Sequence, residues 1–231
     1  PRYLEGLSGF GLYNNSIYEL CKDGELVKIN YDKSRAKKID YSQDLEDILF
    51  KKKGFYNIDF LWEDTFLFSE INHSLIINRP PYYILKENCL GYEYHAESQK
   101  ILFWGSDKIG IAYETEESRD KENTAPGISI KWVYLIGKNI SQCFWVYQGS
   151  YVLFKDGDNV YLAGPSQLEI PHLSFITEVM KGTLISYNEE TGCVYFLDAK
   201  TAELKSIELV PKKHLIINPF PELIRIGKQL H

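Results

Sequence analysis

The residues best suited to chemistry in this sequence are carboxylates near predicted strands. Asp59, Glu93 and Glu178 stand near the starts of the first strands of a repeated unit, and Asp64 and Glu70 stand close to a turn. Glycoside hydrolases use two or three such carboxylates around one pocket, where one donates a proton and another acts as base or nucleophile. No recurring position of the repeat holds a carboxylate, so we expect no catalytic site and keep a five-bladed glycoside hydrolase as the alternative.

Histidine and cysteine positions give no sign of a metal or redox centre. The five histidines are His73, His95, His172, His214 and His231. They lack the H-x-H and H-x-x-x-H spacings of a local metal site. The four cysteines are Cys21, Cys89, Cys143 and Cys193. None belongs to a C-x-x-C pair and each stands among apolar or aromatic residues, so we expect buried, unreactive thiols, no metal and no cofactor.

The charge balance argues against nucleic acid as a partner. The 231-residue chain has a formal net charge of −6, and its only dense basic runs are 51–53 and 212–213. Binding to a phosphate backbone needs clustered Lys and Arg, whereas short basic runs beside turns are typical of solvated loops.

No run of about 18 apolar residues is present, so we expect no direct membrane insertion by this segment. The sequence begins Pro-Arg-Tyr, and we expect a processed form or a piece of a longer protein.

The elements that position any site form a unit that recurs along the chain. Its second strand reads IYEL at 17–20, TFLF at 65–68, ILFW at 101–104, YVLF at 151–154 and VYFL at 194–197. Another strand precedes each of these segments, and a tight turn leads from each into a third strand. Asp23-Gly24 and Asp156-Gly157 are strong signals for type I′ turns, in which both central residues have positive φ.

We predict an all-β protein, a β-propeller of about five three- to four-stranded antiparallel blades. The repeat averages about 44 residues, which is the size of one blade, and blades that pack face to face cover one another. The predicted single domain spans 1–231, with blades at 9–41, 57–88, 89–138, 139–174 and 175–210 and a closing tail at 211–231. A β-sandwich, which also has short strands at regular spacing, is the structural alternative.

Two local patterns depart from simple strand alternation. The segment 42–50 predicts a short helix between the first two blades, because Ser42 can cap it and its apolar residues share one face. Gly9 and Gly11 lie inside a predicted strand, where glycine indicates a bulge or a close backbone approach.

Two groups of residues are candidates for contact with a partner. The segment 114–127 is polar and without periodicity, and it is predicted to be a long exposed loop. Its candidate interaction residues are Glu116, Glu117, Arg119, Asp120, Lys121 and Glu122. The four tryptophans are Trp62, Trp104, Trp132 and Trp145. We expect these to pack between blades, with a sugar- or peptide-stacking platform as the alternative.

Part of the chain resembles a known propeller region. The segment KILFWGSDKIGIAYETEE, a loop, and then WVYLIGKNISQCFWVYQGSYVLFKDGDNVYLAG are similar to the TolB-like and WD40-like propeller of bacterial PEGA-domain surface proteins. The matching residues are Leu102 to Trp104, Lys108 to Tyr113, Ile140, Phe144-Trp145 and Tyr151 to Phe154. The resemblance covers about 89–210, and neither a PEGA module nor an anchor is visible in this sequence.

The resemblance implies a non-enzymatic propeller of a membrane-anchored protein that faces outside the cytoplasm. Together with the repeat, it leads us to expect an interaction scaffold with a protein partner. A carbohydrate-binding propeller, which uses rim aromatics and carboxylates, stays open beside the glycoside hydrolase as an alternative function.

Overall fold

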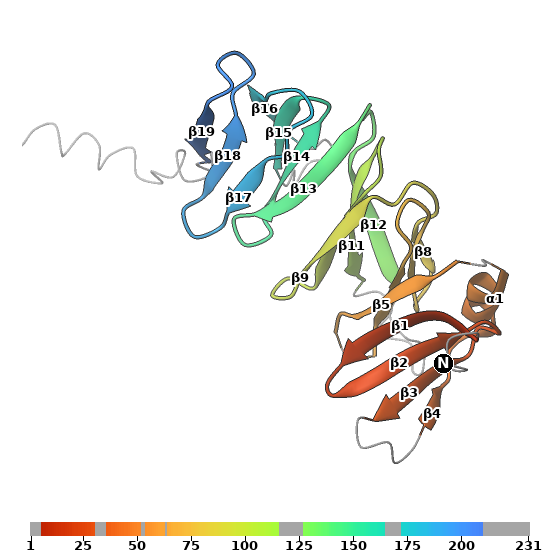
Figure 1. Ribbon diagram of the computed structural model, residues 1–231. Coiled ribbons are helices and arrows are strands. Elements are labelled where there is room, and N and C mark those ends of the chain that lie inside the picture. The colour runs from red at the N-terminus through yellow and green to blue at the C-terminus, as the bar shows by residue number, and fades with distance from the viewer. Residues whose placement is uncertain are drawn as a thin grey trace, which may run out of the picture.

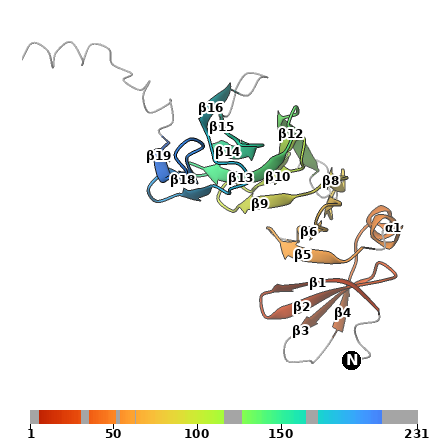
Figure 2. The same ribbon diagram turned by 45° about the horizontal axis from the view of Figure 1, so that its top comes forward.

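A computed structural model describes residues 6–30, 36–51, 54–62, 64–115, 127–164 and 172–209 of the chain. In this part of the chain the strands form five successive meanders, here called blades 1 to 5, with one helix between the first two. Figures 1 and 2 show the blades side by side along an open arc, with blades 1 and 5 at opposite ends. The prediction of an all-β fold of propeller blades is confirmed. The β-sandwich alternative is wrong, because the strands do not divide into two facing sheets.

The strands of each blade follow one another in sequence, and neighbouring strands within a blade are antiparallel. Blade 1 comprises β1 (Leu7–Tyr13), β2 (Ser16–Cys21), β3 (Leu26–Asn30) and β4 (Ala36–Ile39). Blade 2 comprises β5 (Tyr56–Phe60), β6 (Phe66–Ser69), β7 (Leu75–Ile77) and β8 (Tyr83–Leu85). Blade 3 comprises β9 (Gly91–His95), β10 (Lys100–Trp104), β11 (Ile109–Glu114) and β12 (Ile128–Tyr134). Blade 4 comprises β13 (Ile140–Val146), β14 (Tyr151–Asp156), β15 (Asn159–Gly164) and β16 (His172–Glu178). Blade 5 comprises β17 (Ser186–Asn188), β18 (Cys193–Leu197) and β19 (Leu204–Glu208).

The predicted second strands are confirmed in all five blades. The segments IYEL, TFLF, ILFW, YVLF and VYFL coincide with or overlap β2, β6, β10, β14 and β18. Each of these strands lies between the first and third strands of its own blade. The predicted closing tail at 211–231 lies outside the described residues.

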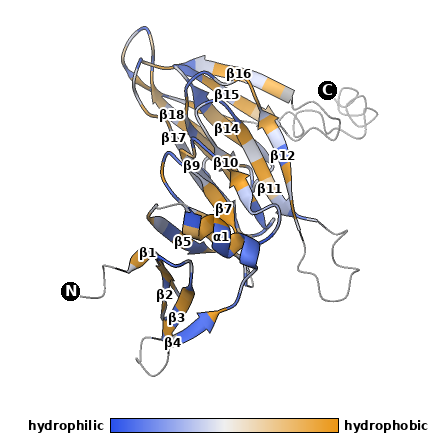
Figure 3. Cartoon of the chain, turned by 90° about the vertical axis from the view of Figure 1, so that its right-hand side faces the viewer, coloured by the Kyte–Doolittle hydropathy of each residue, from blue (hydrophilic) through white to orange (hydrophobic). Residues whose placement is uncertain are grey.

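Within the described residues, each pair of consecutive blades encloses its own apolar core. Side chains alternate between the two faces of a strand, and the second strands of blades 2, 3 and 4 are apolar on both faces. In β6, Phe68 enters the core between blades 1 and 2, whereas Leu67 enters the core between blades 2 and 3. In β10, Phe103 faces blade 2 and Leu102 faces blade 4. Figure 3 shows the resulting hydrophobic stretches along the strands in the middle of the arc.

Blades 1 and 2 share a continuous sheet, because their first strands β1 and β5 pair in parallel. Gly9 lies opposite Tyr56 in this pairing. A Cβ atom on Gly11 would collide with the carbonyl oxygen of Ile58, and one on Gly9 would lie 2.5 Å from that of Tyr56. The close backbone approach predicted for these two glycines is therefore confirmed.

Helix α1 (Gln43–Lys51) connects blades 1 and 2 where the sequence predicts it. The Ser42 hydroxyl accepts a hydrogen bond from the Leu45 backbone N–H at 3.3 Å, which is the capping contact expected at a helix start. Leu45 and Leu49 are buried in the core between the two blades. No helix within the described ranges is long and apolar enough to cross a membrane.

The predicted type I′ turns at Asp23-Gly24 and Asp156-Gly157 are wrong. In each pair only the glycine has positive φ, at 90° for Gly24 and 62° for Gly157. Asp156 is still part of β14 and pairs with Asn159, so the second loop consists of Gly157 and Asp158. Glycine at the first central position is typical of a type II′ turn instead.

Candidate functional site

The carboxylates Asp59 and Glu93 do not converge on one pocket. Asp59 of β5 accepts a hydrogen bond from the Tyr92 hydroxyl of β9. Tyr92 and Glu93 are successive residues of a strand, so their side chains leave opposite faces of it. Tyr92 therefore points to blade 2, while Glu93 contacts Trp145 of blade 4. The two carboxylates therefore make their contacts on opposite sides of blade 3. The contact of Asp59 joins blades 2 and 3, and that of Glu93 joins blades 3 and 4.

Glu93 forms the polar contact between blades 3 and 4. Its Oε2 accepts a hydrogen bond from the Trp145 backbone N–H at 3.0 Å. Its backbone oxygen accepts one from the Trp145 indole N–H at 3.1 Å. Burial raises the pKa of the Glu93 carboxyl, and the Trp145 N–H partly opposes that shift by stabilising the charged form.

Gln142 forms a similar contact one blade further along. From β13, its amide Nε2 donates to the Ile185 carbonyl at 3.1 Å, and its Oε1 accepts from the Ile185 N–H at 2.8 Å. Polar side chains near the first strands thus fasten blade 2 to 3, 3 to 4 and 4 to 5. The residues predicted for acid–base chemistry occupy two of these three fastening positions.

The remaining predicted carboxylates are scattered. Glu178 is the last residue of β16, the outermost strand of blade 4, where it pairs with Asn159. Its predicted place near a first strand is wrong, because the next blade begins only at Ser186. Asp64 is exposed in the turn between β5 and β6, and Glu70 lies in the turn between β6 and β7.

The predicted interaction loop lies outside the described residues, with its candidate residues Glu116, Glu117, Arg119, Asp120, Lys121 and Glu122. On its two sides, Thr115 and Gly127 are joined by hydrogen bonds from the Thr115 N–H and hydroxyl to the Gly127 carbonyl, at 3.2 and 3.1 Å. A largely buried ion pair between Arg79 and Glu114, at 2.8 Å, fastens this end of β11 to blade 2.

The cysteines are free thiols. Cys89 and Cys143 are buried in interblade cores as expected, and burial raises the pKa of Cys89 to about 11. Cys21 and Cys193 are only half-buried, which the sequence did not predict. In the described ranges no group of three His, Cys, Asp or Glu residues could hold a metal ion.

The prediction that tryptophans pack between blades is confirmed, because two are buried in interblade cores and the other two pack against these cores. Trp62 is buried between blades 2 and 3 and stacks on Tyr94 with ring centres 5.6 Å apart. Trp145 is buried between blades 3 and 4. Trp104 packs against that second core as well, and Trp132 packs edge-on against Phe103.

One face of blade 1 is mostly apolar and has no covering blade among the described residues; Lys38 of β4 continues the row of Val27 on this face. This end face is defined by Phe10, Leu12, Ile17, Glu19, Val27 and Ile29. Its members form two cross-strand rows over β1, β2 and β3, namely Phe10–Glu19–Val27 and Leu12–Ile17–Ile29. Leu12 is 71% exposed and Phe10 is 46% exposed. On the opposite face of β2 and β3, Tyr18, Leu20 and Leu26 are buried in the core between blades 1 and 2.

A second open feature is a groove of about 590 Å³ between blades 3 and 4. Its lining includes Ser98, Lys100, Tyr113, Lys131, Trp145 and Gln148. It lies at the end of the blades where the β9–β10 and β13–β14 hairpins turn. The sequence did not single out Lys100 or Lys131, because isolated lysines in strands are common on solvated faces.

Comparison with known proteins gives only distant structural likeness. No family model and no curated protein matches the chain. Among solved structures, the Cps50 (Swd1) β-propeller domain of Myceliophteria thermophila is 7% identical with a TM-score of 0.45, over 88% of this chain and 83% of that one. The C-terminal WD40 domain of Sif2 is 13% identical with a TM-score of 0.47, over 90% and 56%. An auxiliary nutrient binding protein from Bacteroides thetaiotaomicron VPI-5482 is 10% identical with a TM-score of 0.36, over 87% and 56%. The chain thus spans a little over half of the last two structures.

The strand order of the chain itself defines its class. Five successive antiparallel meanders, each sharing an apolar core with the next, make it a β-propeller-type protein whose described blades form an open arc. The solved structures named above include WD40 β-propeller domains and a nutrient-binding protein. The resemblance to PEGA-domain surface proteins stays a prediction.

Proposed function

We propose that this protein is a non-catalytic interaction scaffold that binds a protein partner through the end face of blade 1, within a larger surface or membrane-anchored protein. The observation that supports this proposal is the exposure of Phe10 and Leu12. In blades 2 to 4, by contrast, both faces of the second strand are buried in cores. Contiguous exposed apolar surface on a soluble protein marks contact sites for other molecules.

The shape of the end face favours a β-sheet of the partner as its occupant. Its two rows extend over three neighbouring strands, so the face is broad and shallow. The faces between consecutive blades of this protein are covered by the neighbouring sheet, which is the usual way to bury one side of a sheet. Complete burial of a Leu or Phe side chain contributes about 1.5–3 kcal/mol, so Phe10 and Leu12 can anchor such a contact.

Site-specific photocrosslinking in the native cell tests the proposal. A photoreactive residue at Leu12 is expected to give an adduct with a β-sheet segment of another protein. The same residue at Ile136, which is 76% exposed in the β12–β13 connection, is the matched control and should give none. The change Ile17→Arg, which charges the centre of the face, should abolish the adduct. Equal yields at both positions, or an adduct with a second copy of this chain, would overturn the proposal.

The surface location in the proposal is supported by the resemblance of 89–210 to PEGA-domain surface proteins. Protease accessibility of the parent protein in intact cells tests it separately. Digestion in intact cells is expected, and complete protection until lysis would contradict an outside location.

The acidic segment from Glu116 to Glu122 stays a second predicted contact. Replacement of its four carboxylates by amides should weaken partner binding at low salt more than at high salt.

A further inference from the structure

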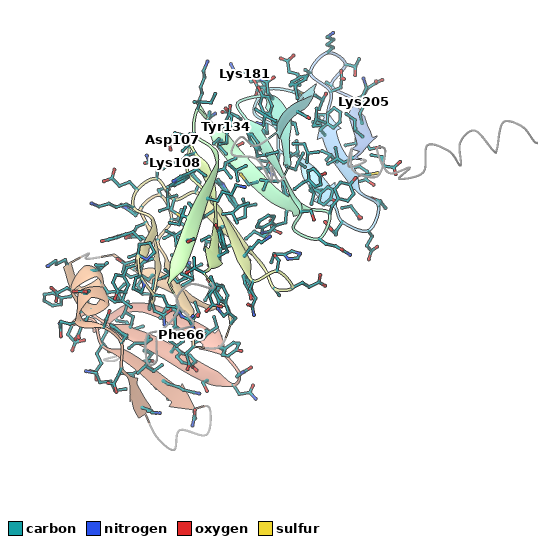
Figure 4. All side chains as sticks on the ribbon, turned by 180° about the vertical axis from the view of Figure 1, so that it is seen from behind. Phe66, Asp107, Lys108, Tyr134, Lys181 and Lys205 are labelled. Carbon is teal, nitrogen blue, oxygen red and sulfur yellow. The ribbon has the colours of Figure 1, made fainter. Side chains whose placement is uncertain are left out.

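The core between blades 1 and 2 ends in an open groove, where the β1–β2 and β5–β6 hairpins turn. Blade 1 contributes the cross-strand row Tyr18–Lys28–Lys37, and blade 2 contributes the pair Phe60–Phe66. Figure 4 places Phe66 where these two blades meet. The groove encloses about 660 Å³, and small-molecule sites have volumes of about 300–1,000 Å³. The groove is therefore large enough for a small organic ligand.

Aromatic side chains form the floor of this groove and hold one another in place. The ring centre of Phe60 lies 4.2 Å from that of Tyr18 and 4.8 Å from that of Phe66. The Tyr13 ring stacks on Phe60 at 4.6 Å and is nearly parallel to it, at 9°. Tyr18 and Phe66 are buried, whereas Tyr13 is 42% exposed. Such a fixed and half-exposed ring can pack against a ligand at little further cost in side-chain entropy.

The polar lining of the groove carries both signs of charge. Two of its cations have carboxylate partners, because Arg79 lies 2.8 Å from Glu114 and Lys38 lies 3.8 Å from Glu25. The other charged residues of the described lining are Lys28, Lys37, Asp40 and Asp64. These two lysines and two aspartates balance each other, so the groove as a whole favours neither an anion nor a cation.

The same residues offer hydrogen-bond donors and acceptors beside the aromatic floor. The ammonium groups of Lys28 and Lys37 only donate, and the carboxylates of Asp40 and Asp64 only accept. The amide of Asn14, in the β1–β2 turn, does both. A sugar hydroxyl is itself both donor and acceptor, and a pyranose ring also has an apolar C–H face that packs on an aromatic ring. The lining is therefore complementary to a neutral sugar.

We propose that this groove binds a short neutral carbohydrate. One pyranose ring packs on Tyr13, and its hydroxyls form hydrogen bonds with Lys28 and Asp64 on the two walls. A charged ligand would bring a like charge next to either the lysines or the aspartates, and removing such a charge from water is costly. The inference is independent of the partner contact at the end face, because Tyr18 and Ile17 are successive residues and point to opposite sides of β2.

Calorimetric titration with the neutral disaccharides maltose, cellobiose, lactose and N,N′-diacetylchitobiose tests the proposal. We expect saturable binding of at least one of them, with a Kd of about 1 mM or tighter. Added salt should leave this affinity unchanged, because the ligand has no charge to be screened. Saturable binding of none of the four overturns the proposal. Tighter binding of the anion glucuronate or the cation glucosamine overturns it as well, and tighter binding of zwitterionic L-tyrosine does so in favour of an amino-acid site.

Variants locate the site. Tyr13→Ala removes the half-exposed ring and should weaken disaccharide affinity about tenfold. Tyr195→Ala is its matched control, because Tyr195 is 36% exposed on β18 of blade 5. Asp64→Asn removes a carboxylate acceptor and should weaken the affinity about fivefold, whereas Asp107→Asn, in the β10–β11 turn and apart from Phe66 of the groove (Figure 4), should not change it. Normal thermal unfolding of each variant confirms folding. Unchanged affinity in Tyr13→Ala and Asp64→Asn, or equal losses in the controls, overturns the assignment to this groove.

Discussion

Glu93 and Trp145 hold each other by two hydrogen bonds across the boundary between blades 3 and 4. The Glu93 carboxylate accepts from the Trp145 backbone at 3.0 Å, and the Glu93 carbonyl accepts from the Trp145 indole at 3.1 Å. Glu93, a candidate catalytic acid in the sequence, thus forms a structural contact between two sheets. The same contact orients the tryptophan that lines the groove between blades 3 and 4.

The first prediction concerns the pH dependence of stability. Because burial raises the pKa of Glu93 in the folded state, its contribution to stability is fully present below the unfolded pKa and is lost as the pH rises through the folded pKa. Glu93→Gln keeps an oxygen that accepts the Trp145 N–H and removes the buried charge. The variant should match the wild type near pH 4 and have the higher free energy of unfolding near pH 7.

Urea unfolding at both pH values measures this difference, and subtraction of the two proteins cancels most of the other titrating groups. The neighbours His95 and Glu189 are present in both proteins, although they also influence Glu93. A variant that is less stable than the wild type at pH 7 would contradict this prediction. It would show that the hydrogen bond from the Trp145 N–H to the ionised Glu93 carboxylate stabilises the fold by more than the burial of its charge costs.

The second prediction concerns the contact between blades 4 and 5. Gln142→Leu removes both hydrogen bonds to Ile185 and leaves its backbone N–H and carbonyl without these partners. We expect a loss of about 1–3 kcal/mol in the free energy of unfolding, which is typical when a buried polar group loses its partner. Gln43→Leu is the matched control, since Gln43 makes only an exposed contact with Asp47. A loss below that of the control would mean that Gln142 does not fasten the blades.

The fold could be predicted from the sequence largely because its second strands are apolar on both faces. TFLF, ILFW and YVLF have no polar alternation, which is the pattern of strands buried on two sides. SIYELC of β2 differs, because Ile17, Glu19 and Cys21 share its second face. That mixed face has no covering blade among the described residues, so the sequence did contain a signal for this end of the described arc.

The candidate sites could not be predicted, because they depend on how separate blades meet. Asp59 and Glu93 look equivalent in sequence, yet the alternation along β9 directs their contacts to opposite sides of blade 3. Tyr13 and Asp64 are 51 positions apart, and only the pairing of β1 with β5 brings them to one groove. The prediction of a type I′ turn at Asp156-Gly157 was wrong for a local reason, because β14 continues through Asp156.

The third prediction concerns the interblade cores. Phe103→Ala should lower the free energy of unfolding by about 3–5 kcal/mol, because the ring is fully buried between blades 2 and 3 and its loss leaves a cavity. Phe175→Ala removes the same group from an exposed site on β16 and should change stability by less than about 0.5 kcal/mol. Urea unfolding of the two variants makes the comparison. Similar losses for both variants would contradict the burial of Phe103 between two blades and the exposure of Phe175 on β16.

The last prediction concerns the ion pair between Arg79 and Glu114, which joins blade 2 to the end of β11. Both side chains are nearly buried, with exposures of 9% and 12%, and their atoms approach to 2.8 Å. Arg79→Met removes the guanidinium from a largely buried carboxylate, so we expect a loss of about 3–5 kcal/mol in the free energy of unfolding. The double variant Arg79→Met, Glu114→Met should recover much of that loss, because it removes the buried charge together with its partner. Urea unfolding of the single and double variants measures the coupling. If the two changes add independently, the ion pair does not fasten the blades.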